Sequence, residues 1–158
     1  MFREGESSVT RLGDAVGMRN SMASAYLRAV NARGIILSRR ENKYVFYRPE
    51  ANPEVEGAVE LLGGLRAAYE MFMPMSLVMK HLTAFTHERR IAAVQALASG
   101  AMEESQLSVK AGISPQALYR HLKKLETRGY IQISKGMVEL SGQEHPLSSV
   151  LLTLAVSS

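Results

Sequence analysis

The sequence has no cysteine, and it lacks the long apolar run that a membrane span requires. The absence of thiols excludes disulfides, thiolate zinc sites and cysteine redox sensing, and it favours a reducing compartment. The longest apolar run, near Leu147–Val156, falls far short of the roughly 20 residues of a transmembrane helix. No basic and then apolar segment opens the chain, so we expect no secretory leader and a cytoplasmic location.

The usual signatures of an enzyme are also missing. The sequence contains no glycine-rich phosphate loop and no Ser-His-Asp or Cys-His arrangement. Its histidines do not show the close spacing of metal ligands; they are His81, His87, His121 and His145. We therefore predict a protein without enzymatic activity, bound metal or cofactor.

What the chain does have is a large apolar content and a positive charge. With 158 residues and 46% apolar content it can form one ordinary domain or two small ones that share a core. A net charge of +4 is compatible with a polyanionic partner, although many basic proteins bind none.

The stretch from Ala111 to Ile131 has the pattern of the second half of a helix-turn-helix. Ser114 suits the N-cap, Pro115 suits the first helical position and Gly129 suits the residue just past the helix end. Leucines recur between these marks at spacings of four and three, which predicts one buried stripe; they are Leu118, Leu122 and Leu125. The residues off the stripe form an exposed face that can touch nucleic acid: Gln116, Tyr119, Arg120, Lys123 and Lys124.

The same pattern occurs earlier in the chain at an offset of 95 residues. The alignment runs without a gap from Leu12 on Leu107 to Ile36 on Ile131, and it superimposes the turn glycines and the stop glycines. Core positions match in character whereas the outward positions differ, as two copies of one fold with separate surfaces would do. Chance similarity between two amphipathic helices is the alternative explanation.

The first copy has the weaker signals. We expect a short helix from Ser8 or Val9, with Val16 on its buried edge, and a second helix over Asn20–Ala32. The second helix has Arg19 where the other copy has Ser114. Its outward residues are expected to be Asn20, Ser21, Ser24, Ala25, Arg28 and Asn31.

A hairpin is predicted to follow each copy. The first has β-rich runs at 35–37 and 44–47 around a polar loop that contains Arg39, Arg40 and Lys43. The second is tighter and carries only Lys135 at its turn. A long helix is expected to open at Asn52–Pro53 and to end at Pro74. Further helices are expected over 77–85, 87–98, 102–111 and after Pro146.

Two segments resemble one family. Leu82–Ile91 is similar to the opening helix of ArsR-type bacterial and archaeal repressors, and Ser114–Ile131 is similar to their recognition helix and wing entry. The likeness covers Leu82–Leu140 and, more weakly, Val9–Tyr47. It implies a winged helix-turn-helix that binds duplex DNA and controls transcription, normally as a dimer. Metal-sensing members use cysteines or paired ligands, which this chain lacks.

The predicted fold class is therefore mainly α with small β-hairpins, built from tandem winged helix-turn-helix repeats joined by a long helix. We place the first repeat in residues 1–73 and the second, more complete one in 74–158. The first copy has no opening helix before Val9, so that helix must come from elsewhere in the chain, from a second subunit or from residues that this chain lacks.

DNA contact is then expected from both copies. Ser114 would lie at the start of the second recognition helix. Gln116, Tyr119 and Arg120 would reach base edges in the major groove, as would Asn20, Ser21 and Ser24 in the first copy. Phosphates would be bound by Lys123, Lys124, Lys135, Arg28, Arg39, Arg40 and Lys43.

Three questions stay open in the sequence. The chain can act as a homodimer or as an intramolecular pseudo-dimer. The main interpretation is a sequence-specific regulator that binds duplex DNA as a repressor, and the alternative is a tandem winged-helix scaffold that binds protein. Four methionines between Met71 and Met79 suggest either a ligand-adaptive surface or gap-filling core, and no small-molecule effector can be named.

Overall fold

The computed structural model describes residues 5–158. Its helices and strands fall into two units, Met1–Arg66 and Ala67–Ser158. The first unit contains β1 (Ser7–Ser8), α1 (Val9–Ala15), α2 (Asn20–Ala32), β2 (Leu37–Glu41) and β3 (Tyr44–Arg48). The division lies inside α3 (Ala58–Glu70). The second unit continues with α4 (Met75–Leu82), α5 (Glu88–Leu97), β4 (Met102–Glu103), α6 (Glu104–Ala111), α7 (Pro115–Thr127), β5 (Ile131–Ser134), β6 (Met137–Leu140) and α8 (Pro146–Ser157).

Each unit contains one small antiparallel sheet of three strands, in the orders β1-β3-β2 and β4-β6-β5. The outer strands β1 and β4 are two residues long and were not expected, because their only signal is pairing with a distant hairpin. Helices make up most of the described chain, and the predicted α+β class is confirmed. The predicted domain boundary at residue 73 stays a prediction.

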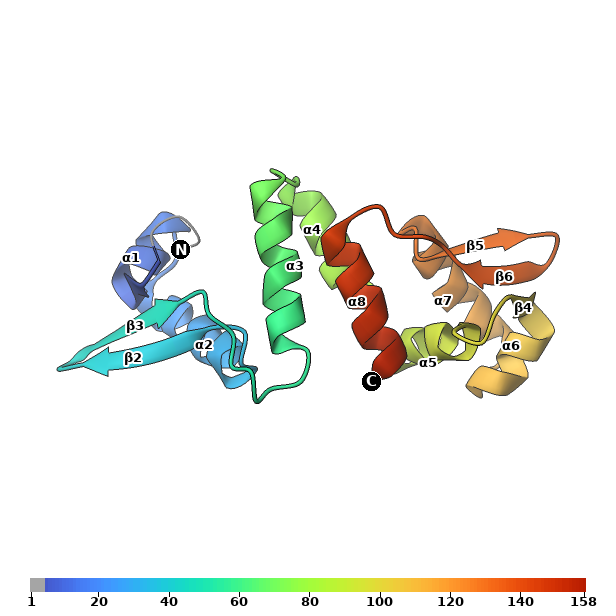
Figure 1. The fold of residues 1–158 in the computed structure, drawn as a ribbon, viewed down its shortest axis with the longest axis horizontal. Helices are drawn as coiled ribbons and strands as arrows, with labels where there is room; N and C mark the ends of the chain where they lie inside the picture. The colour runs from blue at the N-terminus through green and yellow to red at the C-terminus, as the bar shows by residue number, and fades with distance from the viewer. Residues whose placement is uncertain (1–4) are drawn as a thin grey trace. The chain divides into compact units, whose positions relative to one another are not determined.

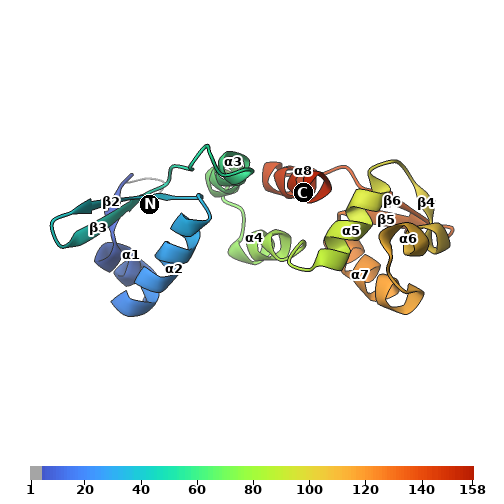
Figure 2. The same cartoon turned by 90° about the horizontal axis from the view of Figure 1, so that it is seen from below.

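The core of the second unit is built around α7. Leu118, Leu122 and Leu125 are at most 1% exposed, and they pack with residues of α5 and α6 and with Tyr130. In Figures 1 and 2, α5, α6 and α7 gather beside the sheet of this unit. Burying three leucines contributes roughly 5 kcal/mol or more of hydrophobic stabilisation, so the predicted stripe determines how α7 is oriented.

Left-handed glycines end the helices before each hairpin. Gly129 has φ +78°, and Tyr130 N–H donates to the Leu125 carbonyl at 3.0 Å. Gly34 has φ +72°, and Ile35 N–H donates to the Val30 carbonyl at 3.4 Å. These hydrogen bonds are related by the same offset of 95 residues as the sequences, and α2 and α7 occupy matching positions.

Fewer side chains of the first unit are buried than its sequence predicted. Val16, expected on the buried edge of α1, is 65% exposed. Leu12, Leu27 and Val30 are only half-buried, whereas their counterparts in the second unit are fully buried. The matching side chains of the second unit are covered by α5, and no helix precedes α1 within the described residues.

The helix that follows the first hairpin is shorter than predicted. It begins at Ala58 rather than Pro53, because the segment before Ala58 forms turns. Asn52 Oδ1 accepts a hydrogen bond from Glu54 N–H at 3.0 Å, and Gly57 adopts φ +76°. It ends at Glu70, before the left-handed Phe72 at φ +53°. Gly63 and Gly64 lie inside a continuous helix.

Other boundaries differ by a few residues. Strands β2 and β3 extend to a two-residue turn at Asn42–Lys43, so the six-residue loop predicted there is wrong. The helix expected over 77–85 is α4, which ends at Leu82, and the first two residues of the helix expected over 102–111 form β4. The helix over 87–98 is confirmed as α5, with His87 as its N-cap.

Replacing a leucine of the α7 stripe is expected to destabilise the second unit. Leu122→Ala should lower the free energy of unfolding by about 3 kcal/mol, because it leaves a cavity at a side chain with no exposed surface. The control Val109→Ala, at a side chain 84% exposed, should change it by less than about 0.5 kcal/mol. Urea unfolding followed by circular dichroism measures both. Equal effects would contradict the assigned core.

Candidate nucleic-acid interface

The exposed side of α7 carries the predicted residues as one surface, which we call the α7 face: Gln116, Tyr119, Arg120, Lys123 and Lys124. All five side chains are exposed, and Tyr119 is 62% exposed despite its size. Their spacings of three and four place them on successive turns, opposite the buried leucines. The face therefore combines an amide, an aromatic ring and three cations on a rigid helix.

Two of these cations have no acidic partner. Among the described residues, neither Arg120 nor Lys124 forms an ion pair, whereas Lys123 Nζ lies 3.3 Å from Glu126 Oε2. Lys123 is therefore partly neutralised by its own helix, although such exposed pairs are weak. The positive charge that this face offers to a polyanion comes mainly from Arg120 and Lys124.

The start of α7 differs from the prediction in one detail. Ser114 is the N-cap residue and Pro115 occupies the first turn, but the Ser114 side chain makes no capping hydrogen bond. Its hydroxyl is left exposed at the helix N-terminus, where the free N–H groups and the helix dipole favour an anion. The hydroxyl therefore adds a polar contact beside these N–H groups.

The hairpin of the second unit presents its lysine at the tip. Lys135 and Gly136 form the two-residue turn between β5 and β6, with φ of +51° and +78°. Both are exposed. Behind the tip, Gln132 and Glu139 face each other across the strands and are hydrogen-bonded. The only lysine of this hairpin thus lies at its end.

In the first unit the predicted helix residues are less uniform. Ser21 and Arg28 are exposed on α2, whereas Ser24 is half-buried. Asn20 Nδ2 donates to Thr10 Oγ1 at 3.4 Å, so this side chain helps to join α2 to α1. Asn31, expected to point outward, donates to the Ile36 carbonyl at 2.7 Å and is half-buried.

The first hairpin is less free to bind anions than its sequence implied. Arg39 donates to Glu6 and to Glu41, each through a 2.7 Å contact, and its guanidinium lies 5.4 Å from the Phe46 ring centroid. The hydrogen bond from Arg39 lowers the pKa of Glu6, and the bond to Glu6 raises the pKa of Arg39. Because Glu6 is 33 residues distant, sequence reasoning had no sign of this pairing.

Two further cations of that hairpin, Arg40 and Lys43, have weaker partners, whereas Arg48 pairs with Glu50 at 2.9 Å. Arg40 Nε donates to the Asn42 carbonyl at 3.3 Å, and Lys43 Nζ lies 5.4 Å from the Tyr44 ring centroid. Neither is held by a carboxylate within the described residues. The positive charge that this hairpin can offer to a polyanion therefore comes from Arg40 and Lys43 rather than from Arg39.

Two arginines that the sequence did not single out position the elements around α7. Arg90 is 5% exposed and donates to the carbonyls of Thr83 and Ala84 and to Thr86 Oγ1, which fixes the turn before α5. Arg128 donates to the Lys80 carbonyl at 3.2 Å and so joins the end of α7 to α4. Both satisfy backbone carbonyls and are structural rather than available for a ligand.

Two histidines contact rings that are far away in the sequence: His87 meets His121, and His81 meets Tyr130. The rings of His87 and His121 lie 4.5 Å apart between centroids, and His87 Nδ1 accepts from Arg89 N–H at 3.1 Å. Burial and the positive charge nearby lower the pKa of His121. Burial also lowers the pKa of His81, whose Nδ1 lies 3.0 Å from the Tyr130 hydroxyl. This hydrogen bond between His81 and Tyr130 ties α4 to the core.

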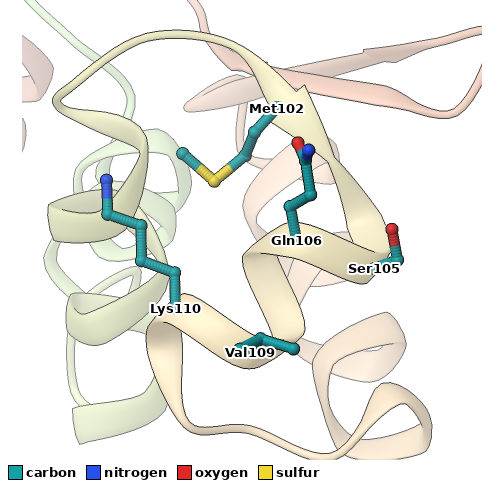
Figure 3. Close-up of a pocket in the computed structure, with 5 residues that line it drawn as sticks. All are labelled: Met102, Ser105, Gln106, Val109 and Lys110. Carbon is teal, nitrogen blue, oxygen red and sulfur yellow. The ribbon is translucent and has the colours of Figure 1, made fainter.

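A shallow hollow lies on another side of the unit. It has a volume of about 600 Å³ and is lined by Met102, Ser105, Gln106, Val109 and Lys110 of β4 and α6. Figure 3 shows these side chains around one open space, with a single titratable group among them. Lys110 also donates to the Ala96 carbonyl at 3.0 Å. The hollow therefore offers no acid and base pair for catalysis.

No group of three or more potential ligands that could hold a metal ion occurs within residues 5–158. In the same part of the chain, no helix has the length and apolar character needed to cross a membrane.

Comparison with protein families gives one match. Residues 87–132 match the model of the helix-turn-helix domain of the bacterial regulatory proteins of the arsR family. The matched segment runs from the N-cap of α5 through α7 into β5, so it contains the whole α7 face. No curated protein matches the chain. The match is typical of DNA-binding transcription regulators and concerns the second unit alone.

Lowering the pH is expected to destabilise the second unit. Because burial holds the pKa of His121 and His81 below 6.5 in the folded protein, the unfolded chain binds more protons as the pH falls through that value. The free energy of unfolding should therefore decrease from about pH 7.5 to 5.5, above the range in which Glu6 titrates. Chemical denaturation across this range should show a smaller decrease in His121→Gln. An unchanged slope would contradict this role.

Proposed function

We propose that the second unit binds duplex DNA as a winged helix, with α7 in the major groove and the β5–β6 hairpin over the phosphate backbone. The observation that carries this proposal is the α7 face. Its cations and its amide lie on one side of a helix whose other side is buried in the core. The helix lies within the segment that matches an arsR-type helix-turn-helix. A face held in this way meets a duplex without rearrangement of the helix.

The side chains divide into two roles. Gln116 and Arg120 have the donors and acceptors that recognise adenine and guanine edges, and Tyr119 offers an aromatic surface with a hydroxyl. Lys123, Lys124 and Lys135 are point charges suited to phosphates, and Ser114 sits at a helix N-terminus that favours an anion. We infer that the lysines set affinity and salt dependence, whereas Gln116 and Arg120 set sequence preference.

We further propose that the first unit is also a winged helix. The support is the shared order of elements and the hydrogen bonds that repeat after 95 residues. Its α2 would present Asn20, Ser21, Ser24 and Arg28, and its hairpin would add Arg40 and Lys43, with Arg39 contributing less because Glu6 holds it. The chain could then act as a pseudo-dimer on half-sites about 34 Å apart, or as a homodimer.

In this view the protein is a prokaryotic repressor that acts in the cytoplasm, where it would occupy an operator and exclude the transcription machinery. That role requires binding and no bond-making step. A protein-binding scaffold remains the second candidate, favoured by the exposed apolar side chains of the first unit.

Removing charge from the α7 face should weaken DNA binding. The variant Arg120→Gln/Lys124→Gln is expected to lose at least about 30-fold in affinity for a duplex selected from a random pool by the wild-type protein. Its dependence on salt should also decrease, by roughly one unit of slope for each lost phosphate contact. The control Arg33→Gln/Lys80→Gln removes the same charge elsewhere. Fluorescence anisotropy at several salt concentrations measures both, and equal losses would argue against the α7 face.

The two units should contribute unequally to the affinity for DNA. Replacing Arg39 and Arg40 by glutamine removes as much charge as replacing Arg120 and Lys124, yet we expect a loss of less than about fivefold, because Arg39 is already paired with Glu6 and Glu41. The same anisotropy measurement decides this. A larger loss from the first wing than from α7 would place the main DNA contact in the first unit.

A further inference from the structure

A pocket of the second unit lies where α4, the end of α7 and the start of α8 meet. It has a volume of about 320 Å³, which is within the range of sites that bind small molecules. Its wall combines polar, charged and apolar groups from the three helices, among them Leu77, His81, Arg128, Gly129, His145 and Ser148. None of these residues belongs to the α7 face, so a ligand in the pocket does not depend on the proposed DNA contact.

Hydrogen bonds fix the wall of this pocket. The side-chain nitrogen of Gln143 donates to the Gly129 carbonyl at 2.8 Å and to the Ser141 carbonyl at 2.9 Å, which attaches the segment before α8 to the end of α7. The Ser148 hydroxyl donates to the His145 carbonyl at 2.9 Å. The pocket is therefore formed in advance, and binding does not have to order the surrounding chain.

His81 supplies a buried polar group to the pocket. The residue is 8% exposed, and its Nδ1 lies 3.0 Å from the Tyr130 hydroxyl. Its Nε2 has no hydrogen-bond partner among the described residues and is not enclosed by protein, so it faces the pocket that His81 lines. When the Tyr130 hydroxyl donates to Nδ1, the proton of the neutral ring lies on Nε2. A buried donor of this kind favours a ligand that accepts a hydrogen bond.

The start of α8 adds groups that favour an anion. No side chain caps this helix of 12 residues, its first position is Pro146, and no acidic residue lies in its first turn. The dipole and the free N–H groups of such a helix start attract negative charge. Beside them, His145 Nδ1 is buried and has no partner within the described residues. Such unsatisfied groups are uncommon, so two imidazoles without a full set of partners at one pocket indicate a site for a polar ligand.

Arg128 gives the pocket a permanent positive charge. It donates to the Lys80 carbonyl at 3.2 Å and to Thr83 Oγ1 at 3.4 Å, but no carboxylate pairs with it among the described residues. Its charge therefore acts on a ligand through space rather than through a direct hydrogen bond. The exposed Glu144 also lines the pocket. A doubly charged anion such as phosphate would be repelled by this carboxylate more strongly than a singly charged one, so the arrangement favours a single negative charge.

We propose that this pocket binds a small organic acid, with its carboxylate at His81 Nε2 and the N-terminus of α8 and its apolar part against Leu77. Leu77 is half-buried, and Gly129 and Gly142 have no side chain, so this part of the wall accepts a hydrocarbon group. Gly129 also follows α7 and leads into β5. A bound acid therefore contacts the turn between the proposed recognition helix and its hairpin.

The first test compares ligands of one shape with and without charge. Benzoate and hexanoate are carboxylates with a flat and a flexible apolar group, and benzamide is the neutral counterpart of benzoate. Nuclear magnetic resonance of the full chain should show saturable binding of at least one carboxylate, with a dissociation constant of about 1 mM or lower. The largest amide shifts should occur at Gly129, Gly142 and Ser148. Benzamide and inorganic phosphate should each bind at least about 10-fold more weakly than benzoate.

The second test fills the pocket. Gly142→Phe should weaken carboxylate binding at least about 10-fold, because a Cβ at Gly142 meets no atom within 4 Å and the ring can occupy the pocket without displacing the protein. The control Gly63→Phe makes the same change at an exposed glycine of α3 whose Cβ also meets nothing within 4 Å, and it should leave binding unchanged. Circular dichroism confirms that each variant is folded.

The third test removes the charge of Arg128. Arg128→Gln should reduce the preference for benzoate over benzamide at least about fivefold, because only the charged ligand interacts with the guanidinium through space. A purely structural role of Arg128 would weaken both ligands equally, so the ratio of the two affinities separates the two roles.

Four results would overturn the proposal. The first is the absence of saturable binding of either carboxylate at concentrations up to about 20 mM. The second is binding whose amide shifts lie outside the pocket, or which both phenylalanine variants change equally. The third is binding of benzamide or phosphate as tight as that of benzoate, and the fourth is an unchanged preference in Arg128→Gln. Loss of DNA binding in the α7 variants would leave benzoate binding intact, so the two proposals fail separately.

Discussion

The burial of three leucines on α7 is the constraint on which the candidate interface depends. Leu118, Leu122 and Leu125 are enclosed by α5, α6 and the segment that follows α7, so the helix cannot rotate about its axis. Every residue of the α7 face is then held toward solvent by packing on the opposite side rather than by contacts of its own. The candidate surface therefore needs few hydrogen bonds within the protein, and Arg120 and Lys124 stay available to a partner.

The two units share the positions of several helices, strands and turns but differ in burial. The left-handed glycines and the hydrogen bonds after α2 and α7 recur at the same offset, so the turn geometry is set locally. Burial does not recur, because it depends on a helix that packs across the pair, and α5 does this only in the second unit. The exposed Val16 and Tyr26 are the consequence, and they make the first unit the better candidate for binding protein.

The sequence correctly predicted features that are determined by residues close together in the chain. The limits of α2 and α7 follow from a glycine at one end and, for α7, a proline at the other. The leucine spacing of four and three correctly predicted which side of α7 is buried. It missed features that require distant partners: the strands β1 and β4, the contact of His87 with His121, and the pairing of Arg39 with Glu6. The predicted start of α3 was wrong for a local reason, because proline after asparagine marks a turn as readily as a helix start.

The pairing of Arg39 also changes the expected balance between the two wings. A phosphate that bound Arg39 would have to displace Glu6 or Glu41, and the released carboxylate would then face a polyanion. The exchange replaces one charge-assisted hydrogen bond by another and adds repulsion, so its net gain is small. Arg120 and Lys124 incur neither cost, because no carboxylate pairs with them in the described residues. Arg39 should therefore add little affinity for a phosphate backbone, and the first hairpin should contribute less than its number of basic residues suggests.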